Sequence, residues 1–257
     1  MITVKLQGGL GNQLFQISAA YALAIENNDE LVLDPNNHFL PLQGRNVSHY
    51  RDTILRKINF EENLKIDTTY HEPNFSFNPI DYVKGQMLVG FLQSEKYFKK
   101  YADEIRELFA IDDVTLLYIK EKHGKILQDL NSVSIHVRRG DYLKLQNVHP
   151  VCDSKYYGSS IKEFSPSSTF YVFSDDVEWC QETFKHKRFK IIDENDIISL
   201  YLMSMCKDNI IANSSFSWWG AWLNRNDNKK VIAPQRWFGD MSNNATKDLI
   251  PSEWELK

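Results

Sequence analysis

The sequence predicts an α/β protein made of two Rossmann-like units, each built around a parallel sheet. The chain opens with a strand, a glycine turn, a helix and a second strand over residues 2–34, an order that implies parallel strands. Strands and helices alternate again over residues 132–233, as in doubly wound α/β domains. The 257 residues are 42% hydrophobic and 25% charged, a composition typical of globular proteins with a substantial core.

The first half of the chain contains the less regular part of this pattern. The elements predicted there are a strand over 2–7, a helix over 12–27, a strand over 30–34, an amphipathic helix over 94–109 with Ser94 as its N-cap, and a helix or helix pair over 112–130. Residues 35–79 are rich in Asn, Pro and His and give no clear assignment.

The second half alternates without interruption. The predicted strands cover 132–137, 169–174, 189–192, 209–212 and 230–233, and the predicted helices cover 153–164, 177–184, 195–206 and 215–224. We therefore expect two domains, 1–128 and 129–257. One continuous α/β domain is the alternative, because about 130 residues is small for such a unit.

Charge and cysteine content exclude several classes of protein. The net charge of −4 argues against nucleic-acid binding through a general positive field, so an anionic ligand would be held by a few placed cations. Cys152, Cys180 and Cys206 lack the spacing of a zinc site or a disulfide framework. Residues 2–6 favour a strand over a signal peptide, and no apolar run reaches a membrane span. We expect a cytoplasmic protein, at most peripheral to a membrane.

The glycine turn is the first candidate site. GGLGNQ, residues 8–13, lies where a strand becomes a helix, so main-chain amides and the helix N-terminus can approach a phosphate. A tight structural turn explains the same residues, because the segment is neither GxGxxG nor a Walker sequence.

The segment SIHVRRGDY, residues 134–142, is the second candidate. It ends an apolar strand, where open α/β sheets bind ligands. Alternation along the strand places His136 and Arg138 on one side, with Arg138 as a fork for a diphosphate. Arg139 is expected to be structural and to pair with Asp141. Surface salt bridges of both arginines are the alternative.

Two further segments carry polar groups at strand ends. In FSDD, residues 173–176, Asp175 and Asp176 suit a helix cap, a cation or the N–H edge of guanine, although no third metal ligand is suitably spaced. IANSSFSWWGAW, residues 211–222, offers hydroxyls and amides at a helix start for a second anionic group. Its tryptophans could line a sugar pocket, but core packing is expected for at least two of them.

The same segments resemble a known family. GGLGNQLFQ, GFLQSEKYF from residue 90, SIHVRRGDYL, FSDD, and YLMSMCKDNIIANSSFSWWGAWLN from residue 201 are similar to the α-1,2-fucosyltransferases of glycosyltransferase family 11. The resemblance covers residues 1 to about 254. HxRRGD followed by NSSFSWWGAW is highly specific, whereas GGLGN alone is not.

The resemblance implies a GT-B-like fold, with an acceptor-side domain, a GDP-fucose-binding domain and a nucleotide-sugar cleft between them. It implies transfer of L-fucose from GDP-β-L-fucose to the 2-OH of a terminal galactose on a glycan, with inversion and without a metal or other cofactor. The expected partners are therefore the donor and a galactose-terminated acceptor, and no nucleic acid.

The resemblance also implies roles for individual residues. It places the main chain around Gly9, Gly11 and Asn12 near the donor phosphates, His136 and Arg138 on GDP, Asp175 or Asp176 on guanine, and Asn213, Ser214, Ser215 and Phe216 around the nucleotide. Arg138 is the expected catalytic cation, because negative charge grows on the departing GDP. The acceptor base is left open among Asp141, Glu95 and His149.

Three other functions remain possible on the sequence. A nucleotide- or glycan-binding protein without catalysis would use the same Arg and Trp groups. A fucosyltransferase of other linkage or acceptor would share the donor motifs. A dinucleotide-dependent oxidoreductase fits the early glycine turn but leaves HVRRGDY and the Ser/Trp segment unexplained.

Overall fold

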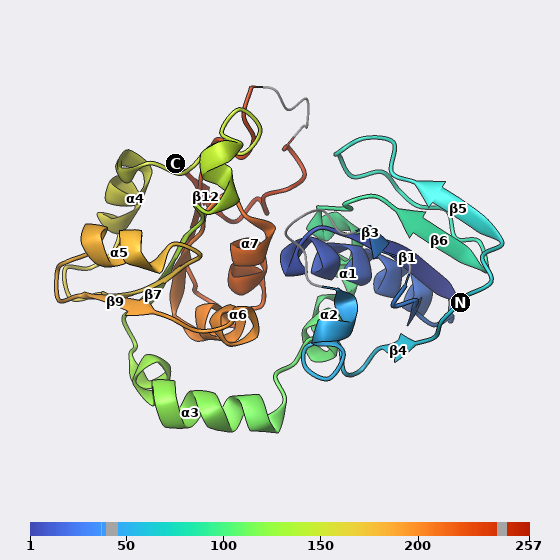
Figure 1. Cartoon of the computed structure of the whole chain (residues 1–257), viewed down its shortest axis with the longest axis horizontal. Coiled ribbons are helices and arrows are strands. Elements are labelled where there is room, and N and C mark those ends of the chain that lie inside the picture. The colour runs from blue at the N-terminus through green and yellow to red at the C-terminus, as the bar shows by residue number, and fades with distance from the viewer. Residues whose placement is uncertain (37, 40–45, 241–245) are drawn as a thin grey trace. The chain divides into compact units, whose positions relative to one another are not determined.

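The computed structural model describes residues 1–36, 38–39, 46–240 and 246–257, and the chain divides into two compact units (Figure 1). The first unit comprises Met1–Asp112 and Asn244–Pro251, and the second comprises Asp113–Asn243 and Ser252–Lys257. The sequence-based boundary after residue 128 differs from this division, because it falls at the end of helix α3 (Asp113–Gln128), which lies within the second unit.

The first unit has a parallel sheet in the order β3-β1-β6-β5 among the described residues. A separate parallel pair joins β2 to β4. The bounds of these strands are β1 Ile2–Gln7, β2 Val32–Leu33, β3 His38–Phe39, β4 Asn59–Phe60, β5 Thr68–His71 and β6 Gln86–Val89. The predicted opening strand is thus confirmed over its full length.

Helix α1 (Leu10–Glu26) follows β1 and packs against it. It begins two residues before the predicted start at Asn12, because the chain turns helical directly after Gly9, its N-cap. Apolar and small residues occupy most of its length, and it is buried on most sides. The side chain of Phe15 packs on Phe98, with ring centroids 6.1 Å apart.

The predicted helix over 94–109 is wrong as a single element. Two 3₁₀ turns, η2 (Glu95–Tyr97) and η3 (Lys99–Tyr101), precede helix α2 (Ala102–Leu108). The interruption is at Phe98, whose φ of −139° is not helical. Its side chain is fully buried, so core packing outweighs helix continuity here. Ser94 is an N-cap as predicted, but of η2: its hydroxyl accepts a bond from Lys96 N at 3.3 Å.

The second unit has a parallel sheet in the order β12-β11-β10-β7-β8-β9 among the described residues. Its elements are β7 Ser132–Val137, η4 Asp141–Lys144, α4 Ser154–Ile161, β8 Thr169–Ser174, α5 Val177–Thr183, β9 Phe189–Ile192, α6 Asp196–Met205, β10 Asp208–Ile210, α7 Ser215–Trp222, β11 Val231–Ala233 and β12 Glu255–Leu256. Strands β7, β8 and β9 begin and end at the predicted residues. Helix α3 is kinked at His123, in agreement with the predicted helix or helix pair.

The order of the strands creates a topological switch point between β7 and β10. The chain leaves β7 toward β8 on one side and leaves β10 toward β11 on the other. Helices α4 and α5 lie on one side of the sheet, and α6 and α7 lie on the other (Figure 1). Open α/β sheets bind ligands in the crevice that such a divergence leaves at the carboxyl ends of the strands. Arg138 directly follows β7, and the segment before α7 directly follows β10.

The expected core packing of the tryptophans in the second unit is confirmed. Trp218, Trp219 and Trp222 are all buried, with mutual ring contacts, so they pack the interior. The three cysteines are free thiols. Within residues 1–36, 38–39, 46–240 and 246–257, no helix combines the length and apolarity needed to cross a bilayer.

Candidate functional site

Two arginines and three aspartates meet where β7 and β8 end. One guanidinium nitrogen of Arg138, Nη1, lies 2.8 Å from Asp175 Oδ2, and the other, Nη2, lies 2.6 Å from Asp141 Oδ1. The Arg139 Nε lies 2.9 Å from Asp176 Oδ2. Arg138 thus lies at the predicted strand end and is held on two sides by carboxylates, which orient its side chain and partly neutralise its charge.

The predicted pairing of Arg139 with Asp141 is wrong. Arg139 pairs with Asp176 and lies over the ring of Trp179, with its Cζ 4.1 Å from the ring centroid. The chain leaves β7 after Val137 and turns at Gly140, where φ is 2° and ψ is −105°. Strand alternation therefore does not extend to Asp141, which pairs with Arg138 instead. The predicted structural character of Arg139 fits these contacts.

The two carboxylates of FSDD have different contacts. Asp176 is the N-cap of α5, and its Oδ1 accepts a bond from Trp179 N at 3.1 Å. Helix capping, one of the three roles that suit this pair, is therefore confirmed for Asp176. Asp175 accepts a bond from Arg139 N at 2.9 Å in addition to its ion pair with Arg138. Recognition of guanine by either carboxylate stays a prediction.

His136 is buried in β7 with an unused nitrogen. Its Nδ1 has no hydrogen-bond partner within the described part of the chain, and its ring centroid lies 5.5 Å from that of Phe216. Burial, assisted by the charge of Arg138, lowers the pKa of His136 to about 3. The imidazole is therefore neutral at physiological pH, and Nδ1 can donate or accept one hydrogen bond with a ligand, depending on the tautomer.

The segment before α7 is anchored from several directions. Asn213 donates from its amide to Pro150 O at 2.8 Å and to Trp237 O at 2.9 Å, and its Oδ1 accepts from the Cys152 thiol at 3.4 Å. These bonds fix the backbone that leads into Ser214, the N-cap of α7, which is 7% exposed. Ser215 and Phe216 form the first turn, where main-chain N–H groups lack intrahelical acceptors.

The three candidate bases lie in different surroundings. Asp141 is engaged by Arg138. Glu95, in the first unit, is 7% exposed and its Oε1 lies 2.7 Å from Lys99 Nζ. His149 stacks on Tyr142, with ring centroids 4.8 Å apart and planes 16° apart, and burial lowers its pKa. The identity of the base therefore stays a prediction.

The glycine turn of the first unit is built from its own motif. Gly8 has φ of +79°, and a Cβ there would meet Asn12 Nδ2 at 2.2 Å, so the turn requires glycine. The side chain of Gln13 donates to Gly8 O at 3.0 Å. A Cβ on Gly9 would have open space around it, whereas Gly11 is buried in the first turn of α1.

A second motif meets this turn, because β6 is the neighbour of β1. Gln93, three residues after Gly90, donates to Asn12 Oδ1 at 2.7 Å. The glycine turn and GFLQSEKYF are therefore adjacent at the carboxyl edge of the sheet. Sequence reasoning missed this contact, which only the strand order could have revealed.

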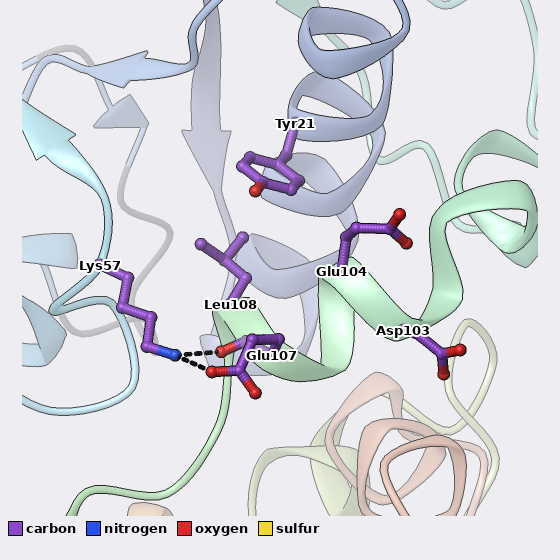
Figure 2. Close-up of a pocket in the computed structure, with 6 residues that line it drawn as sticks. All are labelled: Tyr21, Lys57, Asp103, Glu104, Glu107 and Leu108. Atoms are coloured by element: carbon purple, nitrogen blue, oxygen red, sulfur yellow. Dashed lines mark hydrogen bonds and ion pairs between the residues drawn. The ribbon is translucent and has the colours of Figure 1, made fainter.

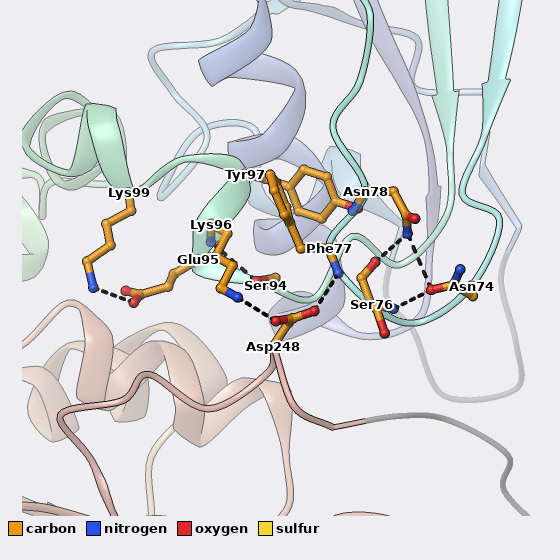
Figure 3. A network of polar contacts seen from close by, with 10 residues as sticks. All are labelled: Asn74, Ser76, Phe77, Asn78, Ser94, Glu95, Lys96, Tyr97, Lys99 and Asp248. Carbon is orange, nitrogen blue, oxygen red and sulfur yellow. Dashed lines mark hydrogen bonds and ion pairs between the residues drawn. The ribbon is translucent and has the colours of Figure 1, made fainter.

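The returning segment 246–251 is anchored beside the same motif (Figure 3). Asp248 lies 2.5 Å from Lys96 Nζ and accepts a bond from Phe77 N at 3.0 Å. Phe77 in turn packs against Tyr97, with ring centroids 4.9 Å apart. Asp248 was not singled out by the sequence, since nothing around it indicates a long-range partner.

A pocket of about 470 Å³ lies elsewhere on the first unit (Figure 2). It is lined by Tyr21, Lys57, Asp103, Glu104, Glu107 and Leu108. None of the sequence-predicted site residues is among them. Within the described ranges, no group of three or more His, Cys, Asp or Glu side chains could hold a metal ion.

Comparison with known proteins identifies the family of this chain. The family model for glycosyl transferase family 11 matches residues 1–255. The chain is 33% identical to an alpha-1,2-colitosyltransferase of Escherichia coli, over 99% of this chain and 98% of the relative. It is 31% identical to the O-antigen biosynthesis glycosyltransferase WbnK of Escherichia coli, over 97% and 98% of the two chains. Galactoside alpha-(1,2)-fucosyltransferase 2 of Pongo pygmaeus is 25% identical, over 86% and 68%.

Solved structures support the fold class. The fucosyltransferase NodZ from Bradyrhizobium superimposes with a TM-score of 0.50 at 11% identity, over 85% of this chain and 91% of NodZ. POFUT1 in complex with GDP gives a TM-score of 0.50 at 12% identity, over 89% and 95%. These likenesses concern the fold, which is of the GT-B type with parallel α/β sheets. The match of the family model to almost every residue shows that this chain belongs to glycosyl transferase family 11.

Proposed function

We propose that this chain is an inverting α-1,2-fucosyltransferase, which moves L-fucose from GDP-β-L-fucose to the 2-OH of a terminal galactose on a glycan. The observation that carries the proposal is Arg138, a cation at the carboxyl end of β7, beside the switch point of the sheet and oriented by Asp141 and Asp175. Ligands of open α/β sheets bind at this position.

The chemistry requires stabilisation of a leaving diphosphate. As the bond between fucose C1 and the β-phosphate oxygen breaks, negative charge accumulates on GDP and positive charge on the sugar ring. Arg138 and the main-chain N–H groups at the start of α7 would stabilise the charge on GDP, because both are already oriented before the reaction. His136 would donate or accept one hydrogen bond through Nδ1.

The acceptor hydroxyl attacks from the opposite face of the sugar, which inverts C1. Its proton passes to a base late in the reaction, and we keep Asp141, Glu95 and His149 as the candidates. Substituting each by an isostere, Asp141→Asn, Glu95→Gln and His149→Gln, separates them. The base is the residue whose loss lowers kcat but leaves the affinity for GDP unchanged.

We also propose that the reaction needs no metal ion, because a guanidinium and main-chain N–H groups can supply the positive charge that a cation would otherwise provide. Addition of EDTA should leave the transfer rate unchanged. A rate that falls with EDTA and returns with Mg²⁺ or Mn²⁺ would contradict this part of the proposal.

A second donor sugar is favoured by one comparison. The colitosyltransferase is 33% identical to this chain, against 25% for fucosyltransferase 2. Colitose is fucose without its 3-hydroxyl, so a site for one sugar needs little change to accept the other. Both relatives carry α-1,2 in their names, and the linkage therefore has broader support than the identity of the sugar.

The experiment is a donor and acceptor matrix. The protein is incubated with GDP-β-L-fucose or GDP-L-colitose and with a β-galactoside or its 2-deoxy analogue, and products are identified by mass spectrometry and NMR. Fucosylation of the galactoside but not of the 2-deoxy acceptor supports the proposal. A preference for GDP-L-colitose would make colitose, and not fucose, the donor sugar. Product from the 2-deoxy acceptor would refute the α-1,2 linkage. GDP binding without transfer would support the non-catalytic alternative.

A further inference from the structure

Tyr142 connects the two halves of the switch point. It lies in η4, four residues after Arg138, and its ring centroid is 5.3 Å from the guanidinium carbon of that arginine. Its hydroxyl donates to Asn213 O at 3.1 Å. One side chain thus touches the cation that follows β7 and the backbone that follows β10.

The contact with the ring differs in kind from the other contacts of Arg138. Asp141 and Asp175 orient the guanidinium but also offset its charge. An aromatic face attracts a cation through its quadrupole and carries no net charge. The ring can therefore hold the guanidinium in place without offsetting its charge any further.

The hydroxyl bond fixes where the ring lies. Asn213 immediately precedes Ser214, the N-cap of α7, and is itself buried and bonded to two other loops. Burial also raises the pKa of Tyr142, so its hydroxyl stays protonated and can donate. The ring stacks on His149, which also packs on Phe238 with centroids 5.8 Å apart. Tyr142 therefore has little freedom to move.

We propose that Tyr142 is a positioning residue that sets the distance between the Arg138 guanidinium and the N-terminus of α7, so that both reach one diphosphate. This inference rests on the proposed function, in which these two groups bind the donor pyrophosphate. Loss of Tyr142 should weaken contacts to the β-phosphate and leave the nucleoside and α-phosphate contacts unchanged.

The test compares GDP with GMP, which lacks the β-phosphate. Calorimetric titration gives the ratio of the two dissociation constants for wild type, Tyr142→Leu, Tyr142→Phe and Arg138→Lys. We expect the preference for GDP to fall about tenfold in Tyr142→Leu, since a partly buried cation–π contact contributes on the order of a tenfold factor. Tyr142→Phe keeps the ring and loses one hydrogen bond, so its preference should fall about threefold and its kcat about tenfold.

Tyr118→Leu is the matched control. Lys122 Nζ lies 5.3 Å from the Tyr118 ring centroid, the same separation as in the Arg138 pair, but on helix α3. This variant should keep the wild-type ratio and kcat.

The outcomes separate this inference from the proposed function. If Arg138→Lys loses the preference for GDP and both Tyr142 variants keep it, Tyr142 does not position the arginine. If a Tyr142 variant loses affinity for GDP and for GMP by the same factor, the role of Tyr142 is structural and the inference is wrong. Should Tyr142→Leu fail to fold, Tyr142→Phe alone decides. If wild type shows no preference for GDP over GMP, the proposed function fails and this inference fails with it.

Discussion

Removal of the Arg138 guanidinium should affect the rate of transfer far more than the stability of the fold. In Arg138→Ala the carboxylates of Asp141 and Asp175 lose their shared partner. The arginine side chain is 28% exposed, so each ion pair is partly screened and contributes up to about 1 kcal/mol. The free energy of unfolding should therefore fall by about 1–2 kcal/mol, well within the stability of an ordinary domain.

The effect on transfer should be far larger. Removal of one preorganised hydrogen-bond donor at a developing anion lowers the rate about 10²–10³-fold. Removal of an arginine that stabilises the charge on a transferring phosphoryl group lowers kcat about 10³–10⁵-fold. We expect kcat/KM for the donor to fall about 10³-fold, which corresponds to about 4 kcal/mol of transition-state stabilisation. Product formation is followed by mass spectrometry, and folding by thermal melting in circular dichroism.

The adjacent arginine is the control. Arg139 has a similar ion pair, to Asp176, but it packs over Trp179 beside helix α5. Arg139→Ala should lose about the same stability and less than tenfold in kcat/KM. If Arg138→Ala retains kcat/KM within tenfold of wild type, or if both variants lose activity equally, the assignment of Arg138 to the leaving diphosphate is wrong.

Three further predictions test the surroundings of the site. In Gly140→Ala the new Cβ meets Asp175 Oδ2 at 2.4 Å, so we expect about 1–2 kcal/mol of lost stability by denaturant titration and a reduced kcat; unchanged stability would contradict the close approach. His136 is neutral in the folded state with a pKa of about 3 but titrates near 6.5 when unfolded, so its contribution to stability is complete above pH 6.5 and is lost as the pH falls toward 3, by up to about 1.4 kcal/mol per pH unit. His136→Gln should flatten this slope in melts between pH 6.5 and 4, and an unchanged slope would exclude His136 as its source. Asp248→Ala should cost about 1–2 kcal/mol, because it removes both the Lys96 ion pair and the acceptor for Phe77 N, whereas Asp240→Ala, whose pair with Arg236 is exposed, should cost almost nothing; equal melting temperatures for the two variants would refute the difference.

Strands β7 and β8 of the second unit could be predicted because most of their residues are buried. All six residues of β7 are buried and every second one is apolar (Val133, Ile135 and Val137), whereas β8 contains a continuous apolar run over residues 170–173. Both patterns are typical of strands. In the first unit, β5 is exposed at alternate positions and β6 has only four residues, so the segment from 68 to 89 carries a weak pattern. The predicted helix over 94–109 was wrong for a different reason. Its apolar stripe is real, but burial of Phe98 breaks the helical backbone.

The sequence predicted which residues form the candidate site but not which of them pair with one another. Motif residues identified Arg138, Asp141, Asp175 and Asp176, while the partners of each depend on which strands are neighbours. Gln93 and Tyr142 were overlooked for the same reason, since their contacts with Asn12 and Asn213 cross between segments 81 and 71 residues apart. The residues around each position do not indicate which distant segment it will contact.

The register of β7 and β8 explains why HVRR and FSDD act as one structural unit. Val137 is opposite Ser174 in the parallel pair, so the next residues of the two chains come opposite each other in the same order. Arg138 then meets Asp175 and Arg139 meets Asp176, which are the ion pairs observed. A shift of one residue would turn every side chain of β7 to the other face of the sheet, and both ion pairs would be lost together. Burial of β7 therefore fixes the register, and the register in turn determines which arginine faces the switch point.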